Sequence, residues 1–172
     1  MNQQTNGSYW EPSYETYYRA YFQELASEAL VGRWQQIDFV TAFFVAATAS
    51  GSAITGLSFW SKPGWITVWG SIAVVVSLTS IAHGAVKVPE RLKEQEERRR
   101  LFAKLRVDVE TFRQQLRIGL TAEEADKRYA EIRTRYAQYT ENLRPDLADT
   151  ERLRLKVQKT LNNILEEYIR HE

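Results

Sequence analysis

Cysteine is absent from the 172 residues, and histidine occurs only twice. The missing cysteine excludes disulfide bonds, thiol nucleophiles and cysteine-ligated metals. The two histidines, His83 and His171, leave neither a metal-ligand cluster nor an acid–base dyad. Most carboxylates lie three or four positions from a basic residue, as they do on solvated helices. The sequence therefore argues against an enzyme, and it calls for no cofactor or metal.

Charge is missing from the middle of the chain. Between Phe39 and Val86 there is one cation, Lys62, and no carboxylate, whereas 20 of the 23 Lys and Arg residues lie at or beyond Lys87. The sequence thus consists of an uncharged stretch followed by a highly charged one. The net charge of +1 sums the two and says little about partners.

The uncharged stretch has the length of two membrane crossings. Residues 39–60 and 65–86 each provide 22 uncharged positions, separated by Pro63–Gly64, a turn signal. A helix of that length spans roughly 30 Å, the thickness of the hydrocarbon core of a bilayer. The sequence therefore predicts a tight transmembrane hairpin in contact with membrane lipid.

The basic residues orient this hairpin. Arg33 precedes the first crossing, and Lys87, Arg91 and Lys93 follow the second, against Lys62 alone in the connecting turn. Because basic residues stay on the cytoplasmic side, both termini are expected in the cytoplasm. No cleavable signal peptide is visible before the first apolar run, so that run is expected to act as its own insertion signal.

Helical periodicity marks the segments on either side. Apolar residues recur every three or four positions in four sets. These sets are Tyr14, Tyr18, Tyr21 and Leu25; Phe102, Leu105, Val109, Phe112 and Leu116; Ala125, Tyr129, Ile132, Tyr136, Tyr139 and Leu143; and Leu153, Val157, Leu161, Ile164 and Tyr168. We expect an all-α membrane protein with an N-terminal amphipathic helix (1–36), a transmembrane hairpin (37–88) and a cytoplasmic helical bundle (89–172).

Local signals place several of the helix ends. Pro12 suits a first helical turn, and Thr121 with Glu124 forms a capping box after the break at residues 118–120. Asp149 or Thr150 caps the last helix. The two matched heptad patterns on either side of the break predict an antiparallel helical hairpin. The N-terminal helix either lies in the membrane interface or packs on the cytoplasmic helices.

Small residues form a stripe along each predicted crossing. The stripes comprise Ala42, Ala46, Ala49, Ala53 and Gly56 on the first, and Gly70, Ala73, Ser77, Ser80 and Gly84 on the second. Helices in lipid meet where small residues allow their backbones to approach. These stripes are expected to pack against each other or between subunits.

Hydroxyl groups form another face of the first crossing, made of Thr41, Thr48, Ser52 and Thr55. Such hydroxyls bond their own helix or a neighbouring one, or they line a water-filled path when several subunits converge. Because two helices cannot enclose a pore, the pore interpretation requires a homo-oligomer. His83, the one titratable group well inside a crossing, is either a neutral interfacial residue or a gate.

The charged half contains two further candidate binding features. Arg98, Arg99 and Arg100 are candidate contacts for a nucleotide or for anionic lipid, and such a cluster next to a crossing also fixes topology. The tyrosines at 129, 136 and 139 either stack on bases or pack in the bundle with their hydroxyls at its rim.

The order of these parts resembles the SLATT family, the SMODS- and SLOG-associating two-transmembrane effectors of bacterial antiphage systems. The likeness covers nearly the whole chain, from Trp34 through the 39–86 hairpin to the helices after Pro89. It implies a pore-forming effector in the bacterial inner membrane. It also implies a trigger, either a nucleotidyltransferase partner or its nucleotide or oligonucleotide product.

Three interpretations follow for function. The first is an oligomeric ion channel that is gated from the cytoplasm and permeabilises the membrane. The second is a non-conducting scaffold that recruits a cytosolic partner through its heptad helices. The third is a membrane-anchored module that binds a nucleotide or nucleic acid.

Overall fold

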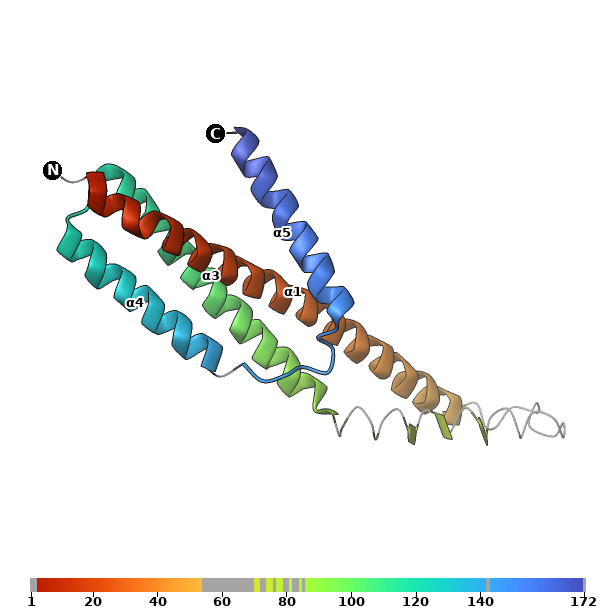
Figure 1. Ribbon diagram of the computed structural model, residues 1–172. Helices are drawn as coiled ribbons and strands as arrows, with labels where there is room; N and C mark the ends of the chain where they lie inside the picture. Colours follow the sequence, from red (N-terminus) through yellow and green to blue (C-terminus); the bar gives the residue numbers. More distant parts are fainter. Residues whose placement is uncertain are drawn as a thin grey trace. The chain divides into compact units, whose positions relative to one another are not determined.

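The computed structural model describes residues 3–53, 86–141 and 143–171, together with Gly70, Ser71, Val74, Val75, Ser77, Leu78, Ile81 and Gly84. Within these residues the regular secondary structure is entirely helical, which confirms the predicted all-α class. The helices are α1 (Gln3–Ala53), α3 (Val88–Ile118), α4 (Ala122–Glu141) and α5 (Glu151–His171) (Figure 1).

The chain divides into two compact units. Unit 1 combines Met1–Val31 with Glu94–Glu172, and unit 2 is Gly32–Lys93. Helices α1 and α3 each contribute residues to both units. Unit 1 therefore brings the two ends of the sequence into one folded body.

Across the part of the chain that the structure describes, no helix combines the length and the apolar character needed to cross a membrane. The predicted crossings at 39–60 and 65–86 include residues 54–60, 65–69 and several positions between 72 and 85 that lie outside the described residues.

Helices α3 and α4 form an antiparallel pair in unit 1. Phe102, early in α3, contacts the rings of Tyr136 and Tyr139, late in α4, with centroid distances of 6.5 and 6.0 Å. Phe112, later in α3, stacks on Tyr129, earlier in α4, at 5.8 Å. This reversed order of contacts confirms the helical hairpin that the matched heptad patterns predict.

The predicted apolar face of α3 supplies most of the core of unit 1. All five of its members are at most 2% exposed, namely Phe102, Leu105, Val109, Phe112 and Leu116. Ala125 and Ile132 of α4 and Ala20 of α1 complete the cluster. Tyr129, Tyr136 and Tyr139 are half-buried at its edge, so the tyrosines pack in the bundle.

The N-terminal part of α1 packs on α3 through aromatic and basic side chains. The Arg113 guanidinium lies 4.4 Å from the Trp10 ring centroid and 4.9 Å from that of Tyr14. Further along, Arg106 lies 4.7 Å from the Tyr21 centroid, and its Nε donates to Glu24 Oε2 at 2.7 Å. The sequence leaves two placements open for this segment, in the membrane interface or against the helices of the charged half. In the structure it packs against those helices.

The expectation that Pro12 begins the first helix is wrong, because α1 starts at Gln3 and Pro12 lies in its interior. An interior proline removes one backbone hydrogen bond and costs about 3 kcal/mol in an isolated helix. Contacts of the turns around it offset this cost. Tyr9 donates to the Asp126 carboxylate of α4, and the Trp10 ring covers Arg113.

Helix α4 begins as the capping box predicts. The Thr121 hydroxyl donates to Glu124 Oε2 at 2.8 Å, and the Glu124 N–H donates back to Thr121 Oγ1 at 3.4 Å. Gly119, with φ of +108°, makes the preceding turn in a conformation that side chains disfavour. The hydrogen bonds from Thr121, first from its hydroxyl and then from its backbone, lower the pKa of Glu124.

Helix α5 is capped by Thr150, the second of the two predicted residues. The Leu153 N–H donates to Thr150 Oγ1 at 3.4 Å, whereas Asp149 instead pairs with Arg154 at 2.6 Å. The buried stripe of α5 comprises Leu153, Val157 and Leu161, and Asn162 accepts a 3.0 Å hydrogen bond from Tyr18 of α1.

The seam between α1, α3 and α4 makes a first stability prediction. Replacing Leu105, which is fully buried, by alanine in L105A leaves a cavity and should lower the free energy of unfolding by about 2–5 kcal/mol. The matched V107A change, at a half-exposed residue of the same helix, should shift it by at most about 0.5 kcal/mol. Denaturation of the full chain followed by circular dichroism measures both, and equal effects would contradict the assigned core.

The capping box makes a second prediction. In T121A the pKa of Glu124 should rise toward its ordinary value, as measured by NMR titration, and the chain should melt a few degrees lower at neutral pH. Because the pKa of Glu124 is lowered in the folded state, its contribution is complete above the unfolded-state pKa and disappears as pH falls through the folded-state pKa. The melting difference should therefore shrink in acid. The control is T134A, since Thr134 only bonds the Ala130 carbonyl of its own helix.

Candidate functional site

Unit 2 exposes large apolar side chains. They come from α1 and from the described positions before α3, and comprise Ile37, Phe39, Val40, Phe43, Val74, Val75, Leu78 and Ile81. Phe39 is 72% exposed and Ile81 68%. Apolar side chains exposed in this number are typical of surfaces that lipid or another protein covers.

The four residues of the predicted hydroxyl face are only partly described. Thr41 is 6% exposed, and its hydroxyl donates to the Ile37 carbonyl one turn earlier in α1. This is the arrangement in which a hydroxyl bonds its own helix. Thr48 and Ser52 lie in α1, but their side chains are outside the described residues, as is all of Thr55.

Every member of the two small-residue stripes whose burial is described is exposed to solvent. Ala42, Ala46, Gly70, Ser77 and Gly84 are exposed. A Cβ added at Gly70 or Gly84 would meet nothing within 4 Å. At these positions, packing of one stripe on the other within a single chain is not observed.

The structure does not describe the side chains of the other predicted stripe residues or of His83. Ala49 and Ala53 lie in α1 with side chains outside the described residues, and Gly56, Ala73, Ser80 and His83 lie outside them entirely.

The three consecutive arginines of α3 do not form one cluster. The Arg98 side chain is 13% exposed and lies 3.5 Å from Glu94, whereas Arg99 and Arg100 are exposed. Arg98 also lines a pocket of about 270 Å³ together with Glu94 and Glu97. Carboxylates beside this arginine disfavour a phosphate there.

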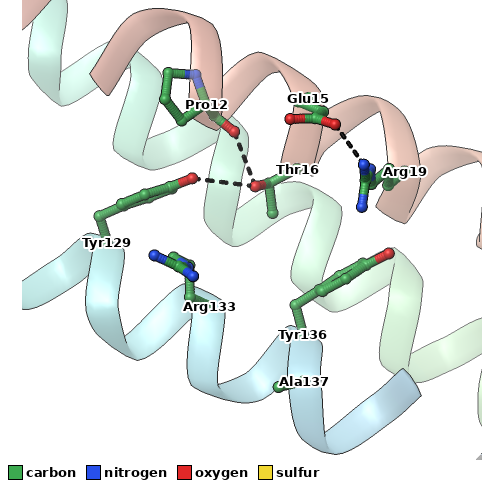
Figure 2. A pocket seen from close by; sticks show the side chains of 8 residues that line it. All are labelled: Pro12, Glu15, Thr16, Arg19, Tyr129, Arg133, Tyr136 and Ala137. Atoms are coloured by element: carbon green, nitrogen blue, oxygen red, sulfur yellow. Dashed lines mark hydrogen bonds and ion pairs between the residues drawn. The ribbon is translucent and has the colours of Figure 1, made fainter. Parts of the chain in front are cut away.

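A larger cleft of about 460 Å³ lies between α1 and α4 in unit 1, and Figure 2 shows the side chains that line it. They are Pro12, Glu15, Thr16 and Arg19 from α1, and Tyr129, Arg133, Tyr136 and Ala137 from α4. In each helix these residues lie one turn or two apart along one side, at 12, 15–16 and 19 in α1 and at 129, 133 and 136–137 in α4. The volume falls within the range of small-molecule sites.

The two tyrosines of this α1–α4 cleft are held by the core behind them. Tyr129 stacks on Phe112, and the Tyr9 ring meets it edge-on at 5.7 Å. Tyr136 contacts Phe102 at 6.5 Å. The Tyr129 hydroxyl lies 3.4 Å from the Thr16 hydroxyl across the cleft (Figure 2). The walls are thus formed before any ligand arrives.

Of the charged side chains in the α1–α4 cleft, Glu15 and Arg19 pair with each other and Arg133 does not take part. Arg19 pairs with Glu15 at 2.5 Å. The negative charge of Glu15 is the main cause of the raised pKa of Arg19, and a hydrogen bond with Tyr136 contributes less. Arg133 is exposed and makes no ion pair or hydrogen bond with the residues that the structure describes. With two arginines and one glutamate, the lining carries a net charge of +1.

The tyrosines of this cleft were candidates from the sequence, whereas Arg19 and Arg133 were not. A signal was available, because Arg133 lies four positions after Tyr129 and three before Tyr136, on the same face of a helix. Arg19 could be added only by knowing that α1 packs beside α4.

Comparison with family descriptions, with curated proteins and with solved structures finds no match for this chain.

Proposed function

We propose that this chain is an oligomeric, pore-forming membrane effector of the kind that the SLATT resemblance implies. It acts in bacterial antiphage defence by permeabilising the inner membrane when a nucleotide-type signal or a partner protein releases it. The main support for this proposal is the change of character along α1. The first part of this single helix packs in the helical bundle of unit 1, and a later part exposes Phe39, Val40 and Phe43.

Membrane insertion is supported by the sequence and by unit 2. The two 22-residue uncharged runs include residues 54–60 and 65–69, which lie outside the described part of the chain. The exposed apolar side chains before α3, such as Leu78 and Ile81, would be covered by lipid. The basic residues after Val86 then hold unit 1, and with it both termini, in the cytoplasm.

Assembly into a homo-oligomer is required, because two helices per chain cannot enclose a water-filled path. The exposed members of the small-residue stripes, among them Ala42, Ala46 and Ser77, offer faces on which subunits would meet. Thr48, Ser52 and Thr55 would then line the path, with Thr41 turned back on its own helix and His83 near its cytoplasmic end.

A recruiting scaffold is the second candidate function, and one observation favours it. Unit 1 exposes several large apolar side chains, and three of them are more than 60% exposed, namely Ile118 at 87%, Leu147 at 78% and Leu155 at 64%. Such residues suit contact with a cytosolic partner protein. In this alternative the hydroxyl face of α1 serves packing only, and the membrane segment is an anchor.

Current through planar bilayers tests the channel against the scaffold. With a nucleotide or partner signal present, the full chain should give discrete conductance steps, and bulky leucines in the double variant T48L/S52L should abolish them by filling the path. V75L, which adds the same kind of side chain at an exposed apolar position, should conduct normally.

Assembly must be measured in parallel, by the mass of the reconstituted protein. Unchanged current through an intact T48L/S52L oligomer would contradict the assigned lining. Correctly inserted protein that stays silent with nucleotides and partners present would favour the scaffold.

A further inference from the structure

We infer that the cleft between α1 and α4 is a binding site for a small, soluble phosphorylated molecule that also carries hydroxyl or amino donors. Its use as the gating site of a channel would rest on the proposed function, but the binding itself does not.

The phosphate end of the site is Arg133. Its guanidinium extends from α4 between Tyr129 and Tyr136, and no described residue neutralises it (Figure 2). Arginine binds phosphate through paired hydrogen bonds that match the geometry of the oxygens. An arginine whose neighbours are fixed tyrosines is better positioned for this than one on an open helix face, because less of its surroundings must be ordered on binding.

The opposite end of the site is the Glu15–Arg19 pair. One oxygen of Glu15, Oε1, holds Arg19, which leaves Oε2 as an acceptor. Because Glu15 and Arg19 neutralise each other, this part of the cleft offers no unpaired cation to a second phosphate, whereas Glu15 Oε2 accepts hydrogen bonds from hydroxyl or amino groups. The cleft therefore combines one unpaired cation for phosphate, Arg133, with a neutral ion pair whose free carboxylate oxygen accepts from hydroxyl or amino donors.

The competing sites in unit 1 lack this combination. The pocket beside Arg98 carries two carboxylates, and Arg98 is already paired with Glu94. Arg99 and Arg100 are exposed on α3 and line neither of these two pockets. The arginines that the sequence favours are thus less suited to a phosphorylated ligand than the one that it overlooks.

Adenosine 5′-monophosphate is a suitable probe, because it joins one phosphate to ribose hydroxyls and an amino group. Calorimetric titration of the full chain in neutral detergent should show saturable binding, tighter than that of inorganic pyrophosphate. R133A should weaken it by roughly tenfold or more, since a charge-assisted, bidentate contact is lost. The matched change R99A removes an equally unpaired, exposed arginine from α3 and should leave the affinity unchanged.

Four results would overturn the inference. They are absence of saturable binding, equal losses in R133A and R99A, pyrophosphate binding as tight as that of the nucleotide, and displacement of the nucleotide by phosphatidylglycerol added to the micelles. The last would identify a lipid headgroup as the ligand. Thermal melting of each variant by circular dichroism verifies that R133A remains folded, as expected for an exposed side chain.

Discussion

The contact between the aromatic face of α1 and the arginines of α3 is the interaction on which unit 1 depends. Trp10 and Tyr14 cover Arg113, and Tyr21 covers Arg106, which also pairs with Glu24. Each cation–π contact is worth about 0.5–2 kcal/mol, depending on how far water is excluded. The buried α3–α4 seam needs this cover, because Ala20 of α1 completes its core.

That contact also creates the α1–α4 cleft and connects it to the rest of the chain. With α1 held on α3, a second face of α1 meets α4 through the Tyr9–Asp126 and Thr16–Tyr129 hydrogen bonds. The cleft lies on the same side, so a ligand within it would bridge α1 and α4. Since α1 continues to Ala53, the helix that lines the proposed binding site is also the one that carries the first predicted crossing.

The periodic parts of the fold were predictable from sequence, and the contacts between distant segments were not. The α3 core, the Thr121–Glu124 box and the α3–α4 hairpin follow from local spacing, which the structure confirms. The start of α1 was misplaced because tertiary contacts outweigh the local preference of Pro12 for a first turn. The triple arginine stands out in the sequence as a run of like charge, yet Arg98 is partly buried beside Glu94 while Arg99 and Arg100 are exposed. Arg19 and Arg133 lie 114 positions apart, and only the fold brings them into the lining of one cleft.

The depth of unit 2 in a bilayer tests the membrane placement most directly. The absence of cysteine allows single cysteines at two exposed apolar positions, F43C in unit 2 and I118C in unit 1, each labelled with an environment-sensitive fluorophore and reconstituted into vesicles. If unit 2 enters the bilayer, the emission of the probe at 43 shifts to the blue and is quenched by quenchers attached to lipid tails, while the probe at 118 stays in water. Two probes that both remain in water would contradict the membrane placement, and with it the channel.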